Sequence, residues 1–292
     1  MPPSGSPTAR RRLLAAELRS LRISAGRTAD DVGRLLGWSK AKVSRYELAQ
    51  SGLKPTDVAR LLDVYEVEPG RRERLLALAE DATGKGWWDA YSDVLTESHM
   101  AFIGLEAEAT SILDWQINVV PGLLQTEQYA RDVLSAIQAV APITPRAIER
   151  RLEIRLTRQR LLTRDGPLNY HALLDESVLH RQWGDRTAMR AQLHRLVQAS
   201  ELPNVTIQVL PFKPRQTLAL GSFLILHFGS AHKAELPDVV SIEHLSGEVH
   251  IEGDSDAHAF RLAFRHLAGE CLSPPESRDL ILAICRREWG KE

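Results

Sequence analysis

Hydrophobic residues recur at helical spacing through the first 82 residues of the chain. Positions i, i+3 and i+4 are apolar in several windows, which is the pattern of a helix with one buried face. Leu14, Leu18 and Leu21 form one such stripe, and Val58 with Leu61 belongs to another. The pattern predicts five short helices around one small core, at residues 10–25, 28–36, 39–47, 55–65 and 69–82.

A tight turn joins the second and third of these helices. Thr28 is placed to cap the second helix, because a threonine hydroxyl accepts a free backbone N–H of the first turn. Gly37 ends that helix where a left-handed residue is needed, and Ser39 caps the third helix. The third helix buries Val43 and Tyr46. We therefore expect two helices held together across a glycine turn.

The outward face of the third predicted helix is small and basic. A short helix of this kind can enter the major groove of DNA. The same pattern also fits an ordinary helical hairpin on a protein surface, so the pattern alone leaves both interpretations open. The outward residues are Lys40, Ala41, Lys42, Ser44 and Arg45.

This stretch resembles the Xre/Cro-type helix-turn-helix family. The matching positions are Gly26, Thr28, Gly37, Ser39, Val43, Ser44, Arg45 and Glu47. The resemblance implies that Lys40 and Ala41 contact base edges and that Arg45 does so one turn later. Glu47 corresponds to the family's structural acid, which braces the domain. Ala29 departs from the family, since a glutamine that bonds the DNA backbone is common there.

We expect Lys40 or Arg45 to read guanine, while Arg22, Arg27 and Lys42 hold phosphates. One such domain makes few base contacts, so we expect a homodimer on a palindromic site in double-stranded DNA. The complete predicted DNA-binding set is Thr28, Ser39, Lys40, Ala41, Lys42, Ser44, Arg45, Arg22 and Arg27.

Charge is divided unevenly along the 292 residues. The net charge is only −1, yet residues 1–60 hold 12 Lys and Arg against 5 Asp and Glu. The remaining residues hold 25 basic against 33 acidic side chains. A basic N-terminal part followed by an acidic remainder is typical of a regulator in which only the N-terminal part binds the phosphates of DNA.

Other features of the composition favour a cytoplasmic, nucleoid-associated protein. Cys271 and Cys285 lack metal-ligand spacing and are predicted to be buried free thiols. No apolar run is long enough for a membrane helix, and residues 1–9 are expected to be a disordered arm without the hydrophobic stretch of a signal peptide. The sequence leaves open whether Arg10, Arg11 and Arg12 contact the DNA backbone or are solvated.

A second domain is predicted to follow the helical head. The head spans 10–82, a linker spans 83–93, and the second domain spans 94–292. Trp87, Trp88 and Tyr91 make the linker too apolar to be free, so we expect them to pack against the second domain.

The second domain begins with helical patterns. These cover residues 94–115, a helix capped by Thr126, and an arginine-rich helix over 145–162. The six arginines between Arg146 and Arg160 fit either a second nucleic-acid surface or a solvated or partner-facing helix.

Beyond Gly166 short β-branched and aromatic runs alternate with turns. Helices are expected at 187–200, 255–271 and 275–289, and this order predicts an α+β domain with a largely antiparallel sheet. The predicted strands are 169–174, 205–210, 222–228, 239–245 and 248–251.

The second domain is similar to the uncharacterised C-terminal domain of actinobacterial regulators of the WhiJ-like group. The segments that carry the resemblance include RRLEIRLTRQRLL, LLDESVLHRQWG and VTIQVLPF. The resemblance implies a transcriptional regulator that is often paired with a small partner protein in an antitoxin-like arrangement. It implies no ligand or site.

An enzyme is the rival class. Asp175, Glu176 and His180 are the nearest thing to a catalytic or metal-binding cluster, but Asp175 is also well placed to cap the helix that follows it. Hydrolase and phosphate-binding glycine motifs are absent from the sequence. We predict no catalytic residue, cofactor or metal. The other histidines considered, and not assigned as ligands, are His227, His232, His244 and His250.

The prediction is a sequence-specific DNA-binding transcriptional regulator whose C-terminal domain senses a partner protein or a ligand. The alternative is an antitoxin-like interaction module with little DNA binding of its own.

Overall fold

The computed structural model describes residues 6–49, 51–140, 143–213, 218–229, 237–244, 247–252 and 254–290. The chain forms two compact units. The first contains the residues up to Ala90 together with Ile103–Glu108, and the second contains most of the remaining residues. The domain boundaries predicted from the sequence stay predictions.

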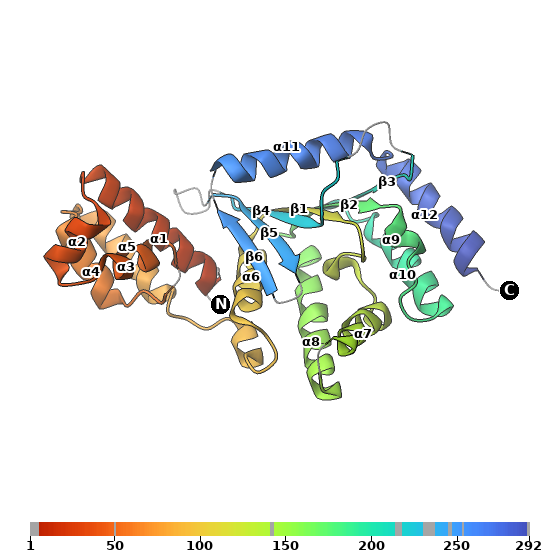
Figure 1. The fold of residues 1–292 in the computed structure, drawn as a ribbon, viewed down its shortest axis with the longest axis horizontal. Helices are drawn as coiled ribbons and strands as arrows, with labels where there is room; N and C mark the ends of the chain where they lie inside the picture. Colours follow the sequence, from red (N-terminus) through yellow and green to blue (C-terminus); the bar gives the residue numbers. More distant parts are fainter. Residues whose placement is uncertain are drawn as a thin grey trace. The chain divides into compact units, whose positions relative to one another are not determined.

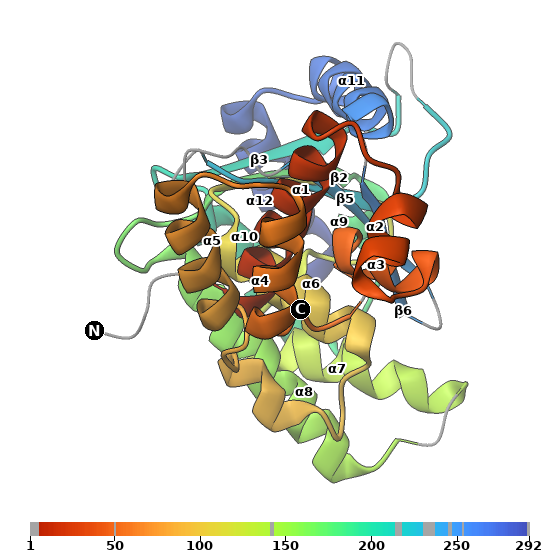
Figure 2. The same ribbon diagram turned by 90° about the vertical axis from the view of Figure 1, so that its left-hand side faces the viewer.

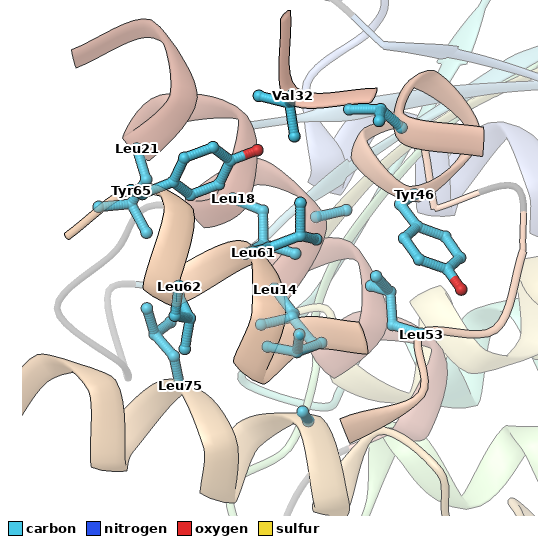
Figure 3. Packing of buried hydrophobic residues seen from close by; sticks show 14 residues of the cluster. Leu14, Leu18, Leu21, Val32, Tyr46, Leu53, Leu61, Leu62, Tyr65 and Leu75 are labelled. Atoms are coloured by element: carbon cyan, nitrogen blue, oxygen red, sulfur yellow. The ribbon is translucent and has the colours of Figure 1, made fainter. Parts of the chain in front are cut away.

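The first unit is helical, as the periodicity predicted, and its helices surround one hydrophobic core. Leu14, Leu18, Val58 and Leu62 are fully buried in it, and Figure 3 shows the leucines of α1 and α4 pointing toward one another. The short helices α2 and α3 lie side by side (Figure 2). The described helices up to residue 81 are α1 (Pro7–Ser24), α2 (Ala29–Leu36), α3 (Lys40–Glu47), α4 (Pro55–Val64) and α5 (Pro69–Asp81).

Helix α1 begins three residues earlier than predicted, with Pro7 in its first turn, where proline is favoured because that N–H has no helical partner. Residues 7–9 are therefore helical and not part of a disordered arm, and residues 1–5 lie outside the described residues. Arg10 is buried, and its Nη1 lies 3.6 Å from Oδ2 of Asp81. Both expectations for Arg10, a DNA contact or a solvated side chain, are wrong.

Within the described residues, the second unit contains one mixed sheet of six strands in the order β3-β2-β1-β4-β5-β6. β1 pairs in parallel with β2, and β2 with β3, while the pairs β1–β4, β4–β5 and β5–β6 are antiparallel. The predicted α+β class with a largely antiparallel sheet is confirmed. The strands are β1 (Ser111–Gln116), β2 (Asn169–Asp175), β3 (Val205–Leu210), β4 (Phe223–His227), β5 (Val239–His244) and β6 (Gly247–Glu252).

β1 corrects the sequence prediction, which continued a helix through residue 115. Helix α6 (Glu97–Glu108) ends earlier, and β1 follows it. In β1, Ile112 lies between Tyr170 of β2 and Leu226 of β4 in the centre of the sheet. A central strand with both faces covered carries a short apolar run whose period does not distinguish it from a helix.

Helices cover both faces of this sheet (Figure 1). α11 (Asp254–Glu270) runs along one face, where Phe264 and Leu267 join a core with Trp115 and Phe223. α7 (Glu127–Ala136) and α8 (Pro145–Arg158) lie on the other side. The remaining described elements are η1 (Trp87–Tyr91), η2 (Gly122–Leu124), η3 (Ile137–Ala139), η4 (Gln159–Leu162), α9 (Ser177–His180), α10 (Arg186–Ala199) and α12 (Pro274–Trp289).

Candidate nucleic-acid interface

Helix α2 begins at a reciprocal cap. The backbone N–H of Asp31 donates to Oγ1 of Thr28 at 3.1 Å, and the backbone N–H of Thr28 donates to Oδ2 of Asp31 at 3.0 Å. Hydrogen bonds from Thr28 and Arg34 lower the pKa of Asp31 to about 2. The Thr28 cap predicted from the sequence is present, and its hydroxyl is committed to the start of α2.

The turn between α2 and α3 depends on two glycines. Gly37 has a φ of +68°, and the N–H of Trp38 donates across it to the carbonyl of Gly33 at 2.8 Å, which closes the helix end. A Cβ on Gly33 would lie 2.8 Å from the carbonyl oxygen of Trp38. The absence of a side chain at Gly33 therefore allows the backbone of the turn to pack closely against α2. This role of Gly33 was not predicted from the sequence, although a glycine inside a helical pattern is a visible signal of close backbone approach.

Helix α3 has one face packed in the core and an opposite face that is exposed. Ser39 caps the helix by accepting the N–H of Lys42 at 3.2 Å, while Val43 and Tyr46 are buried. The side chains at positions i, i+1, i+4 and i+5 then share the opposite side of the helix. Of these, Lys40, Ala41 and Arg45 are exposed and Ser44 is half-buried.

Arg22 does not lie on this exposed face. Its guanidinium donates to both carboxylate oxygens of Glu47, at 2.7 and 2.9 Å, and to the carbonyl of Arg27 at 2.7 Å. The Arg22 side chain is 15% exposed and that of Glu47 is 7% exposed. The pair joins the end of α1 to the end of α3, so Arg22 has a structural role within the head. The prediction that Arg22 holds a phosphate is not supported by this geometry.

Lys42 also points away from the exposed face, toward α4. Its Nζ lies 3.0 Å from Oδ2 of Asp57 and 3.8 Å from the centroid of the Trp38 ring. The hydroxyl of Tyr46 donates to the same carboxylate at 2.5 Å. These two donors lower the pKa of Asp57 despite its partial burial. Asp57 and Trp38 were not singled out from the sequence.

The other predicted contact residues lie around the start of α2 and α3. Arg27 is half-buried, and Thr28 and Ser39 are exposed. A further arginine, Arg60 of α4, donates to the carbonyl of Leu36 at 2.9 Å and so holds α4 against the turn.

The acidic and histidine cluster of the second unit forms structural contacts. Asp175 accepts the N–H of Ser177, the first residue of the short helix α9, at 2.9 Å. His180 Nδ1 lies 2.7 Å from Glu288, and its Nε2 lies 3.4 Å from Glu176. Among the described residues, no group of three or more His, Cys, Asp or Glu side chains is arranged to hold a metal.

Three of the other histidines considered from the sequence lie in the second unit. His227 Nδ1 lies 2.7 Å from Asp238, and His250 Nε2 lies 3.4 Å from the carbonyl of Ser98. His244 is the last residue of β5, and His232 lies outside the described residues.

Most arginines of the α8–η4 segment bind within the second unit, which neither interpretation of that segment anticipated. Arg150 pairs with Asp93 at 3.0 Å, and Arg151 donates to the carbonyl of Val94 at 3.1 Å. Arg155 donates to Gln125 at 2.6 Å, and Arg158 is buried with its guanidinium 5.1 Å from the Phe102 ring centroid. Of the six arginines, only Arg146 and Arg160 are exposed.

Cys285 is buried and Cys271 is half-buried, and both are free. No helix in the described part of the chain is both long enough and apolar enough to cross a membrane.

Comparison with known proteins agrees with this arrangement. A family model described as a helix-turn-helix domain matches residues 13–75, which contain α2, the turn and α3. This match indicates a DNA-binding regulator. A second model, described as a domain of unknown function (DUF5753), matches residues 100–283. No curated protein and no solved structure matches the chain. Because the second match covers more than half of the chain, the protein belongs to the DUF5753 family and carries a helix-turn-helix domain ahead of that region.

Proposed function

We propose that the protein is a sequence-specific transcriptional regulator that reads the major groove of DNA with helix α3. The observation that carries this proposal is the exposed face of α3, where Lys40 and Arg45 flank the small residues Ala41 and Ser44. The caps and the Gly33–Trp38 contact hold that helix in one orientation. A rigid helix with small central side chains can approach base edges closely.

Each residue on or beside this face has a proposed task. Lys40 and Arg45 bond guanine O6 or N7, and Ala41 and Ser44 allow the helix to enter the groove. Ser39 lies at the start of α3 and Arg27 just before the start of α2, where phosphate contacts set the register of the protein on the duplex. Thr28 is left out because its N–H and its hydroxyl both donate to Asp31. Arg22 is left out of this set because its guanidinium bonds Glu47.

We propose that the protein acts as a homodimer on a palindromic site. The exposed face of α3 offers only a few base contacts, and two heads on half-sites one helical turn apart multiply the specificity. The second unit would provide the dimer contact and respond to a small partner protein or a ligand. Its resemblance to the WhiJ-like, antitoxin-like group favours a partner protein. Such a regulator would work in the cytoplasm, bound to the nucleoid.

The test is binding of the full-length protein to fluorescent duplexes over a salt series. One duplex carries the DNA upstream of its own gene and the other a scrambled sequence of equal composition. We expect binding to the upstream duplex that is about 10³-fold tighter or more, with a steep salt dependence for both duplexes. A double charge reversal, Lys40→Glu with Arg45→Glu, should abolish both kinds of binding.

The control for that variant is Arg34→Glu, since Arg34 is an exposed cation of α2 that pairs with Asp31. Equal and weak binding to both duplexes would contradict the proposal for the protein alone. In that case the search turns to a partner protein that dimerises the head, which is the alternative function.

A further inference from the structure

Lys42 occupies a position on α3 from which a phosphate contact is expected. It follows Ala41 by one residue and therefore lies about 100° further round the helix. A helix in the major groove turns its tip toward the bases and its flanks toward the two sugar-phosphate strands. Lys42 is on the flank that faces α4. Its side chain is 32% exposed, so it lies at the edge of the head and not within its core.

The structure nevertheless holds the Lys42 ammonium inside the head. Asp57 lies 3.0 Å from Nζ, and the Trp38 ring lies beneath it with its centroid 3.8 Å away. Asp57 is itself fixed from a second side by the Tyr46 hydroxyl, and its side chain is 16% exposed. The ammonium therefore has both a carboxylate and an aromatic face as partners, and each attracts a cation.

Release of Lys42 to the DNA would leave the Asp57 carboxylate without its cation, close to the phosphates. Two negative groups would then face each other across a short distance, which is unfavourable. While the pair is intact, Lys42 and Asp57 together present no net charge to the DNA backbone. The pair thus removes a sequence-independent attraction and leaves the base contacts of Lys40 and Arg45 unchanged.

We propose that Asp57 is a specificity-determining positioning residue, which holds Lys42 against Trp38 and withholds that cation from the DNA backbone. The result is weaker binding to non-specific DNA and a larger ratio of specific to non-specific affinity. This inference rests on the proposed function, because it concerns the same helix in the same groove.

The test compares Asp57→Asn, Lys42→Met and the double variant in the full chain, with the salt dependence of binding to scrambled duplex as the readout. Lys42→Met leaves the Asp57 carboxylate without its cation close to the phosphates, so it should weaken binding to scrambled duplex. Asp57→Asn should steepen the slope of log K against log salt by about 0.9 per bound head, since one more phosphate is neutralised, and should tighten non-specific binding several-fold at low salt. The double variant should return to the wild-type slope.

The double variant separates release of Lys42 from the simple loss of a negative charge. If Asp57→Asn steepens the slope equally with and without Lys42, the effect is one of net charge and the proposal is overturned. A double variant whose slope is flatter than that of the wild type by about 0.9 also overturns it, because Lys42 would then already contact a phosphate in the wild type. Tyr46→Phe is the matched control, since it removes the other bond to Asp57 and leaves the ion pair intact.

A readout without DNA distinguishes failure of this inference from failure of the proposed function. The side-chain ammonium resonance of Lys42, assigned by its absence in Lys42→Met, should shift on Asp57→Asn in the free protein. If the Lys42 resonance shifts but the wild-type protein binds no duplex, the Lys42–Asp57 contact exists. The proposed DNA-binding function, and with it the effect of this contact on DNA binding, would then be disproved. A missing shift, with selective DNA binding intact, would disprove the Asp57 contact alone.

Discussion

Arg22 and Glu47 form a two-point ion pair between helices α1 and α3, with N–O distances of 2.7 and 2.9 Å. Both side chains are largely buried, and the third donor of Arg22 bonds the carbonyl of Arg27. The pair fixes the far end of the proposed reading helix, while the glycine turn fixes its beginning. The orientation of α3 is therefore set at both ends.

Removal of one partner of this pair should destabilise the helical head. Glu47→Ala leaves a largely buried guanidinium without its carboxylate, which typically costs about 3 kcal/mol or more. The measurement is urea unfolding of the full-length protein followed by circular dichroism. Arg34→Ala breaks an exposed pair with Asp31 and should cost less than about 1 kcal/mol. Equal losses for the two variants would contradict the bracing role of Glu47.

Gly33→Ala should disturb the turn. The added Cβ would meet the Trp38 carbonyl at 2.8 Å, and a backbone atom in a closed turn cannot move aside as a side-chain end can. We expect a loss of about 1–3 kcal/mol and weaker selective DNA binding, because α3 must shift. Gly52→Ala is the control, since nothing lies within 4 Å of its added Cβ. Thermal unfolding and the duplex-binding assay check both effects.

Glu66→Gly should stabilise the head, because Glu66 adopts a φ of +52° at the end of α4. The N–H of Val67 donates back to the carbonyl of Leu62 at 3.2 Å, so Glu66 fills the left-handed position of a helix end where glycine is preferred. The left-handed strain relieved is about 1 kcal/mol, partly offset by the entropy of the unfolded glycine.

The control for Glu66→Gly makes the same exchange inside a helix. Glu73 is exposed within α5, so Glu73→Gly should destabilise by about 1 kcal/mol. A melting temperature above that of the wild type for Glu66→Gly and below it for Glu73→Gly would support left-handed strain at Glu66. A lower melting temperature for both variants would refute it.

Acid should weaken the start of α2. The pKa of Asp31 is lowered to about 2 in the folded protein, from 3.8, by its bonds to Thr28. A carboxyl with a lowered pKa stabilises the fold above its unfolded pKa and loses that contribution as the pH falls toward its folded value. Stability should therefore decline between about pH 4 and pH 2. The difference in unfolding free energy between wild type and Asp31→Asn isolates this group and should shrink over the same interval.

Arg45→Ala should relax sequence selectivity. Arg45 is exposed on the same side of α3 as Ala41, where a guanidinium can bond a base edge. We expect a loss of about 1–3 kcal/mol on the cognate duplex and reduced discrimination at one base position. Binding to a set of single-base duplex variants measures this. An equal loss on every sequence would instead make Arg45 a phosphate contact.

The sequence predicted the local parts of the proposed interface correctly. Thr28 and Ser39 cap their helices, and Gly37 adopts the left-handed turn conformation. Each feature depends on bonds between residues that are at most a few positions apart, so residue type and spacing carry enough information to predict it.

The roles of the charged residues were less predictable. Arg22 lies 25 positions from Glu47, and the sequence alone gave no reason to place the two together. The same is true of Lys42 and Asp57, which belong to different helices. From the sequence, a basic side chain near a predicted DNA-binding helix therefore suggested a phosphate contact. The structure shows that Arg22 and Lys42 instead pair with carboxylates of the head.

Taken by itself, the amino-acid sequence determined the helices of the head, the caps of α2 and α3, the α+β class of the second unit and the charge difference between the two parts of the chain. These properties follow from hydrophobic period, local hydrogen bonding and composition. The tertiary structure decided that β1 is a central strand, and that Arg22 and Lys42 bind carboxylates within the head. Such outcomes depend on which distant segments meet, because burial and pairing are set by the neighbours that the fold brings together.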